Sequence, residues 1–361
     1  LEQAQATFRN VLSDKSFGEL FVGGERPSLG RHVFASVQSL GNHPEIYTKQ
    51  KFDMVIVDEA HHSSAPSYLK ILERLEAKQM LFMTATPERT DGVTLQEYFF
   101  NGQSTAEIRL WDAIDRGQLC PFSYFGLSDG TDLSRLKWSA GGYDIAGLDG
   151  IYTGNDARSN LILKEIVEHV SDIHRMRALG FCVSVKHAQY MARKFNEAGV
   201  PSVAIHGNST QQEREAAISD LKLGSVSVIF VVDLFNEGVD IPELDTLLLL
   251  RPTDSPVLFQ QQLGRGLRHC KGKHCLTVLD FIGQSHKKFS WESRIKPMLA
   301  SGAGSLSYQV QNKFPLLPAG CSYKLDEKSS KVVLENIKSS TSARDVIKEE
   351  YARDDHSPMS L

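Results

Sequence analysis

The stretch that decides the fold is Met54-Val55-Ile56-Val57-Asp58-Glu59-Ala60-His61, in which four apolar residues are followed directly by two carboxylates. A short, continuous apolar run is typical of a strand that is buried on both faces of a parallel sheet. In open α/β sheets, ligands bind at the carboxyl ends of the strands. The run therefore predicts a buried strand whose acidic tip, Asp58 and Glu59, lies at a binding site.

The residues that follow continue the alternation of helix and strand. Residues 68–75 predict a helix and residues 80–83 a second buried strand, which gives the strand–helix–strand pattern of a parallel sheet. The second strand ends in Thr84-Ala85-Thr86, so hydroxyl side chains are expected at the same edge as the carboxylates. Upstream, the same patterns predict a helix over residues 1–12 and short strands at residues 20–22 and 33–35.

A second α/β unit is expected from residue 159 onward. Helices are predicted over residues 159–176, 188–198, 211–223 and 257–263, and strands over residues 180–183, 202–205, 226–232, 246–250 and 275–279. Between residues 111 and 156 the periodicity is weak and glycines are frequent, which predicts a linker. We therefore expect an α/β protein with a first domain over residues 1–110, the linker over 111–156, a second domain over 157–285, and a C-terminal extension over 286–361 that begins an accessory domain.

Composition and charge exclude several classes of protein. The 361 residues contain 40 Lys+Arg and 44 Asp+Glu, a net charge of −4, with 41% hydrophobic and 23% charged residues. These values exclude a mostly disordered chain and an indiscriminately basic surface. No apolar run approaches the ~18 residues that span a bilayer, so no membrane partner is expected. Five scattered cysteines without a CxxC pair indicate a reducing compartment, and we expect a cytoplasmic protein.

Adjacent carboxylates at a strand tip suit a site that holds a cation. Asp58 can hold a hydrated Mg²⁺ on the phosphates of a nucleotide, while Glu59 can orient and deprotonate the attacking water. The structural alternative is a helix N-terminus that merely favours acidic residues. The order Asp-Glu-Ala-His differs from the His-Glu-x-x-His of zinc proteases, so a metalloprotease is not favoured.

The second unit supplies a matching set of polar residues. After the strand at residues 226–232, Gly238 permits close backbone approach, and Asp240 can accept from a ribose hydroxyl or a neighbouring Arg. Arg265 and Arg268 lie three residues apart, on one side of a predicted helix, where their guanidinium groups suit phosphate oxygens. The alternatives are an acidic turn and a solvated basic helix end. A basic cluster over one short stretch is formed by Arg265, Arg268, Lys271, Lys273, Lys287 and Lys288.

In this order and at these strand ends, the segments resemble the motifs of superfamily 2 helicases and translocases of the DEAH-box type, in the branch of the type III restriction motors. Residues 58–61 are similar to motif II, 84–86 to motif III, 181–184 to motif IV, 236–242 to motif V and 261–268 to motif VI. Residues 34–40 and His206-Gly207 resemble two smaller motifs. The resemblance covers roughly residues 1–283 and implies two RecA-like parallel-sheet domains.

The resemblance also implies a role for each matching residue. The catalytic residues are Asp58, which holds Mg²⁺ through water, Glu59, the general base, and Arg265 and Arg268, the arginine fingers. The nucleotide is lined by Gly238, Asp240 and Gln261. The state of the bound nucleotide is coupled to nucleic-acid binding by His61, Thr84 and Thr86. The nucleic-acid backbone is contacted by Ser36, Gln38, Ser184, Lys186 and His206.

One departure from the family pattern is the phosphate-binding loop, because no G-x-x-x-x-G-K-[ST] occurs in these residues. Since residue 1 is Leu, we expect a fragment whose first domain lacks the loop, its strand and its helix, and which alone hydrolyses ATP weakly or not at all. The intact protein is expected to use ATP and Mg²⁺ as a helicase or translocase. DNA is favoured over RNA as the partner. A nuclease or a restriction/defence module, fused or associated, is also expected outside this chain. The alternative is a non-hydrolysing nucleic-acid-binding scaffold.

Overall fold

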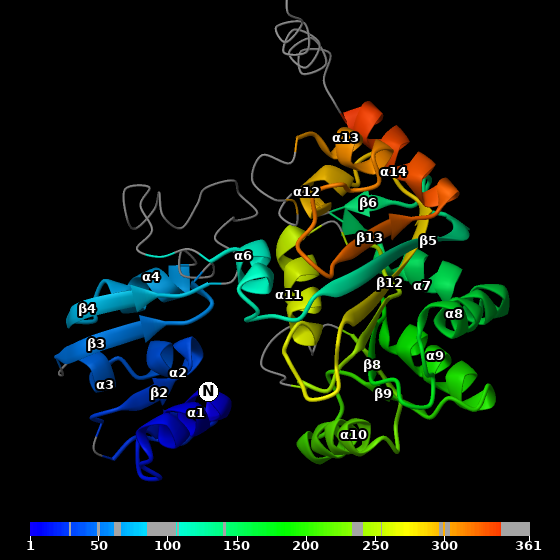
Figure 1. Cartoon of the computed structure of the whole chain (residues 1–361). Helices are drawn as coiled ribbons and strands as arrows, with labels where there is room; N and C mark the ends of the chain where they lie inside the picture. The colour runs from blue at the N-terminus through cyan, green and yellow to red at the C-terminus, as the bar shows by residue number, and fades with distance from the viewer. Residues whose placement is uncertain are drawn as a thin grey trace, which may run out of the picture. The chain divides into compact units, whose positions relative to one another are not determined.

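The computed structural model of the chain divides into two compact units, Leu1–Ala106 and Glu107–Leu361, and each is described here by itself. Figure 1 shows both units, with most of their helices and strands labelled. The structure describes residues 1–28, 30–48, 51–60, 66–84, 106, 108–139, 142–232, 241–253, 255–295, 299 and 304–340.

The first unit contains two pairs of parallel strands among its described residues. The strands are β1 (Glu19–Phe21), β2 (Val33–Ala35), β3 (Phe52–Val57) and β4 (Ala77–Phe82). β1 pairs with β2, and β3 pairs with β4. The helices are α1 (Glu2–Leu12), α2 (Val37–Asn42), α3 (Glu45–Thr48) and α4 (Pro66–Leu72). The predicted strand–helix–strand unit is therefore confirmed as β3, α4 and β4.

Burial of β3 differs from the expectation. Met54 is 51% exposed and Ile56 is 42% exposed, whereas the continuous apolar run predicted a strand buried on both faces. Within the described part of this unit, β3 belongs to a two-stranded sheet. Two strands cannot support the helical layers that bury a parallel strand on both faces, so its apolar side chains are left partly in solvent.

The second unit is built on a seven-stranded sheet in which every strand is parallel to its neighbours. The strand order is β13-β5-β12-β11-β8-β10-β9. The strands are β5 (Phe122–Asp132), β8 (Ala178–Phe181), β9 (Ser202–Ile205), β10 (Val228–Val231), β11 (Thr246–Leu249), β12 (Leu276–Gln284) and β13 (Ser322–Leu325). A parallel sheet of this kind confirms the expected α/β class.

Helices cover both faces of this sheet (Figure 1). α8 (Asp156–His169) and α9 (Val185–Glu197) supply the core of one face. The other face is covered by α6 (Leu110–Asp115), α10 (Gln211–Leu223), α11 (Pro256–Gly266), α12 (Trp291–Ile295), α13 (Leu306–Gln311) and α14 (Glu327–Ser340). The short elements α7 (Ile145–Tyr152), β6 (Trp138–Ser139) and β7 (Gly142–Tyr143) complete the unit. The predictions for residues 202–205 and 211–223 match β9 and α10 residue for residue.

Two segments that were expected to lie outside the second domain belong to its sheet. β5, from the expected linker, lies between β12 and β13, and β13 comes from the expected extension. Tyr323 of β13 stacks on Tyr124 of β5 with ring centroids 4.0 Å apart. Arg294 of α12 forms a buried ion pair with Asp280 of β12. The structure differs from the expectation here because strand pairing across 150 or more residues leaves no local periodic signal.

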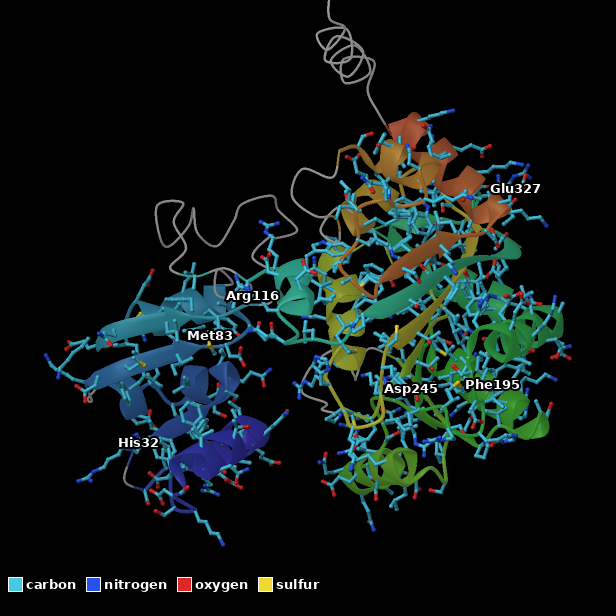
Figure 2. The ribbon with its side chains drawn as sticks, viewed as in Figure 1. His32, Met83, Arg116, Phe195, Asp245 and Glu327 are labelled. Atoms are coloured by element: carbon cyan, nitrogen blue, oxygen red, sulfur yellow. The ribbon has the colours of Figure 1, made fainter. Side chains whose placement is uncertain are left out.

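The common direction of the strands gives the sheet an amino edge, where its strands begin, and a carboxyl edge, where they end. Asp245, just before β11, and Glu327, just after β13, mark the two edges in Figure 2. α11 leaves β11 at the carboxyl edge and returns the chain to the amino edge before β12. Segments that follow a strand and segments that precede one therefore lie on opposite sides of the unit.

The interior strand β8 requires a residue without a side chain at Gly180. A Cβ atom there would lie 2.4 and 2.6 Å from ring carbons of Phe230, which is itself held edge-to-face by Phe195. We predict that Gly180→Ala lowers the free energy of unfolding by about 1–3 kcal/mol, because overpacked cores must shift. Gly150→Ala is the matched control, since nothing lies within 4 Å of a Cβ in that helical position. Chemical denaturation measures both, and equal stability of the two variants contradicts the prediction.

Candidate functional site

The acidic tip of β3 is joined to the end of β4 by backbone hydrogen bonds. The amide of Met83 donates to the carbonyl of Val57 at 2.9 Å, and the amide of Ala60 donates to the carbonyl of Met83 at 2.9 Å. Asp58 and Glu59 therefore lie beside Thr84, as the sequence predicted. Asp58 is exposed at this strand end, whereas Glu59 is half-buried and its Oε2 atom is shielded from solvent.

Glu59 has an unusual backbone conformation. Its φ is +48°, in the left-handed region that residues with a side chain rarely adopt. Its amide donates to Oδ1 of Asp58 at 3.0 Å, which fixes the first carboxylate against the turn. Strained backbone of this kind costs about 1–3 kcal/mol and is found most often at functional sites.

Ser36 and Gln38 are the two residues of the first unit that were predicted to contact nucleic acid, and their side chains have different surroundings. Ser36 caps α2: its Oγ accepts from the amide of Ser39 at 3.1 Å and donates to the hydroxyl of Ser39 at 2.9 Å. Gln38, in the first turn of the helix, is exposed. The Ser36 hydroxyl is therefore committed to its helix, whereas the Gln38 amide is presented to solvent.

At the carboxyl edge of the second unit, Ser184 also serves as a helix cap. Its Oγ accepts from the amide of His187 at 3.0 Å and donates to the carboxylate of Asp149 on α7. Burial raises the pKa of Asp149, but the hydrogen bonds from Ser184 and Thr153 outweigh it, and the net shift is downward. The Ser184 hydroxyl thus ties α9 to α7 and has its own protein partners.

The other predicted nucleic-acid residues of this unit lie at the same carboxyl edge. Lys186 follows β8 and is exposed in the first turn of α9. His206 follows β9 and is half-buried, with its amide donating to Oγ of Ser209 at 3.1 Å. Arg214 of α10 donates to the carbonyl of Gly207 at 3.1 Å and holds the loop in place. The structure therefore brings these side chains to one edge, through different strands.

His187, beside these residues, is fully buried. Its Nδ1 accepts from the amide of Val183 at 3.3 Å, so the ring proton lies on Nε2. The ring lies over Tyr152, with centroids 5.5 Å apart. Burial, with the charge of Arg158, lowers the pKa of His187 to about 3, so that the ring is neutral at physiological pH.

The predicted arginine segment differs from the expectation in one respect. α11 includes Gln261 and Arg265 but ends at Gly266, so Arg268 lies beyond the helix rather than on one helical side with Arg265. The small Gly266 packs against Leu276, whose side-chain carbons lie within 3 Å of a Cβ built there. The close approach of α11 to β12 at this point ends the helix before Arg268.

The sequence did not predict that Lys273 forms hydrogen bonds with backbone carbonyls inside the protein. Its Nζ donates to the carbonyls of Gly266 and Arg268, the second at 2.9 Å, and to the carbonyl of Pro242 at 3.4 Å. Burial lowers the pKa of Lys273. A cation is favoured at a helix C-terminus, where carbonyl groups lack partners. Lys273 therefore fixes the backbone that carries Arg265 and Arg268, and links it to the segment before β11.

The basic cluster predicted from the sequence is divided between the two edges of the sheet. Lys271 and Lys273 precede β12, and Lys287 and Lys288 follow it. Nine strand residues at about 3.3 Å each place the two pairs roughly 30 Å apart. The cluster in the sequence is thus two separate basic sites in space.

Four predicted site residues, His61, Thr86, Gly238 and Asp240, lie outside the described residues. In the described part of the chain, no group of three His, Cys, Asp or Glu side chains forms a metal site. No helix within those ranges has the length and apolar character needed to cross a membrane.

Comparison with known families assigns both units. Residues 1–89 match the family described as "Type III restriction enzyme, res subunit", and residues 159–270 match the "Helicase conserved C-terminal domain". A curated relative from Saccharomyces cerevisiae, "Putative ATP-dependent helicase IRC3", is 31% identical over 260 residues, which are 70% of this chain and 37% of that protein. The chain thus spans well under two thirds of this relative's length.

Solved structures share the fold at low sequence identity. A fragment of a "putative HsdR subunit of a type I restriction enzyme" from Vibrio vulnificus YJ016 has a TM-score of 0.59 and 21% identity, covering 76% of this chain and 51% of that one. Dbp5 of S. cerevisiae, solved bound to RNA and ADP BeF3, has a TM-score of 0.55 and 13% identity, covering 94% of this chain and 78% of that one. These neighbours confirm the expected α/β fold with RecA-like parallel sheets.

The buried His187 predicts a pH dependence of stability. The unfolded chain takes up a proton on this histidine below pH 6.5, whereas the folded chain does so only near pH 3. Stability is therefore lost as the pH falls through this window, and the loss between pH 7 and 5 is about 2 kcal/mol. We predict that His187→Asn removes this part of the decline. Denaturation at both pH values tests it, and an unchanged decline in the variant contradicts the assignment.

Lys273 yields a prediction about stability. Lys273→Met keeps the length of the side chain but removes the donor from three backbone carbonyls, and we expect the free energy of unfolding to fall by about 2–3 kcal/mol. Lys271→Met, two residues away and exposed, is the matched control and is expected to change stability little. Equal denaturation midpoints for the two variants would show that the Lys273 contacts contribute nothing.

Proposed function

We propose, since the chain belongs to superfamily 2 of the helicases, that the whole protein is an ATP-dependent helicase or translocase that couples ATP hydrolysis to movement along a nucleic-acid strand. One observation carries the proposal. The carboxylates of Asp58 and Glu59 stand at the end of a parallel strand, tied through Ala60 and Met83 to the strand that ends at Thr84. This arrangement places acid, base and hydroxyl groups at one sheet edge, where a nucleotide and its cation can bind.

The chemistry of the acidic tip suits Mg²⁺ and ATP. Mg²⁺ keeps several of its waters and is usually held by one or two carboxylates together with substrate phosphates. The exposed Asp58 would hold the ion through water, and the half-buried Glu59 would accept the proton of the attacking water. Thr84 would transmit the state of the nucleotide to the rest of the unit.

The second unit would supply the groups that stabilise phosphate charge. Arg265 and Arg268 are proposed as arginine fingers, and Gln261, one turn earlier on α11, as a nucleotide contact. Lys273 supports this role, because three carbonyl contacts hold the backbone around both arginines. The guanidinium groups would then be oriented before the nucleotide binds.

The nucleic acid would contact the carboxyl edge of the second unit through Lys186 and His206, and the first unit through Gln38. For Ser36 and Ser184 we propose a smaller contribution, because both hydroxyls already cap helices. DNA is proposed in preference to RNA, since the first unit matches a restriction-enzyme family. A nuclease or defence module, fused or associated, would complete such a system.

The role of Glu59 as the base gives a direct test in the whole protein. Glu59→Gln preserves the size of the side chain but cannot take a proton, so turnover of ATP is expected to fall at least 100-fold while nucleotide affinity changes little. Steady-state ATPase assays with single-stranded DNA, duplex DNA and RNA measure the first, and binding of a fluorescent ATP analogue measures the second.

The control for this experiment is Glu25→Gln, which changes an exposed glutamate of the same unit. It is expected to leave turnover unchanged. An unaltered hydrolysis rate in Glu59→Gln would refute Glu59 as the base. Absence of hydrolysis in the wild-type whole protein, with nucleic acid still bound, would favour the alternative of a non-hydrolysing nucleic-acid-binding scaffold.

A further inference from the structure

A small hairpin at the carboxyl edge of the second unit is not used by any of the motifs above. β6 pairs antiparallel with β7, with Trp138 opposite Tyr143. The hairpin follows β5, and its Tyr143 hydroxyl accepts from the backbone amide of His286, which follows β12. The hydrogen bond, 2.7 Å long, joins segments that are 143 residues apart. The same edge carries Lys186 and His206.

Three aromatic rings gather at this junction, and we call them the aromatic step: Trp138, Tyr143 and His286. Trp138 and His286 stack nearly in parallel, with centroids 5.2 Å apart and planes at 15°. Trp138 meets Tyr143 edge-to-face at 4.8 Å. All three are half-buried, whereas Trp291 below them is only 2% exposed. The aromatic step is therefore the outer, solvent-reaching layer of an aromatic core.

Positive charge surrounds the aromatic step. Four exposed cations flank it in sequence: Arg135, Lys137, Lys287 and Lys288. Among the described residues, no carboxylate lies within salt-bridge distance of any of these four. Burial lowers the pKa of His286, and the charges of Lys288 and Lys287 lower it further. The charges of Lys287 and Lys288 therefore act on the stacked ring of His286.

We propose that the aromatic step is a further binding site for a single nucleic-acid strand, in which an unpaired base stacks on the Trp138–His286 pair and the neighbouring lysines hold the phosphates. Stacking platforms set in positive grooves are how proteins bind single strands without reading their sequence. A folded core alone does not account for four unpaired cations around half-exposed rings. The proposal rests on the proposed function and adds a contact outside the motifs by which the chain resembles helicases.

The arrangement favours a strand over other anionic ligands. An acidic peptide or a polyphosphate would use the cations but would offer no aromatic partner to the half-buried rings. A nucleic-acid strand offers phosphates and aromatic bases in alternation, which suits two stacked rings whose neighbours in the sequence, Lys137 and Lys287, are exposed cations. Both sites lie at the carboxyl edge of the sheet, on the segments that follow its β-strands. One nucleic-acid strand can therefore extend from Lys186 and His206 to the aromatic step.

Tryptophan fluorescence of the whole 361-residue chain tests the stacking directly. The chain has three tryptophans, and Trp111 and Trp291 are 7% and 2% exposed, so Trp138 is the one that a base can reach. Titration with single-stranded oligo-dT or oligo-rU is expected to quench the emission of Trp138. Trp138→Phe is expected to abolish the quenching but keep most of the affinity, and Trp138→Ala to weaken binding about tenfold.

The lysines are tested by the salt dependence of binding, measured by anisotropy of a labelled strand. Lys287→Gln combined with Lys288→Gln is expected to reduce the slope of log K against log salt by about 1.4, since each phosphate contact to a single strand contributes about 0.7. The matched control is Lys164→Gln with Lys222→Gln, two exposed lysines on α8 and α10. It removes the same charge and is expected to leave the slope unchanged.

Three results would overturn the proposal. They are equal affinity of the wild type and Trp138→Ala, quenching by an abasic strand as strong as by oligo-dT, and equal salt slopes for the two double-lysine variants. The double-lysine change is on the surface, so it keeps the test valid if Trp138→Ala does not fold. Any of these results leaves the ATPase test of Glu59 untouched, whereas loss of turnover in Glu59→Gln says nothing about the aromatic step.

Discussion

The common direction of the seven strands in the second unit is the constraint on which the rest depends. Because each strand begins at one edge and ends at the other, every loop that follows a strand lies at the carboxyl edge. The helix that returns from β11 to β12 necessarily carries Arg265 to the amino edge. The geometry of parallel pairing thus separates candidate nucleic-acid contacts from candidate phosphate contacts within a single domain.

The fold could be predicted wherever local pattern and tertiary environment agree. Residues 211–223 form α10 as expected, since Thr210 and Glu213 cap its start and Gly224 ends it. β5 could not be predicted, because Gly126 and Gly130 interrupt its pattern and its partners come from residues 276–284 and 322–325. Its stability comes from pairing with distant strands, which the local sequence does not encode.

The candidate site was predictable in its residue types and less so in its contacts. The acidic pair at the tip of β3 follows from an apolar run and two carboxylates, and the structure places it beside Thr84. Ser184 caps a helix, and Lys273 donates to backbone carbonyls. Both sets of hydrogen bonds depend on where other segments of the chain lie. A polar side chain in a motif can serve the fold as readily as a ligand, and only its partners distinguish the two.

The buried pair of Arg294 and Asp280 has a consequence for how the protein can be divided. Asp280 is 2% exposed and Arg294 is 1% exposed, and the two are joined across residues 283–285, where the motif resemblance and the expected second domain end. A chain cut after residue 285 would lose the counter-charge of Asp280 together with α12, α13 and α14, which cover that face of the sheet, and the edge strand β13. The boundary of the recognisable family is therefore not a boundary of folding, and chimeras or domain exchanges must carry the segment through α14 as part of the same module.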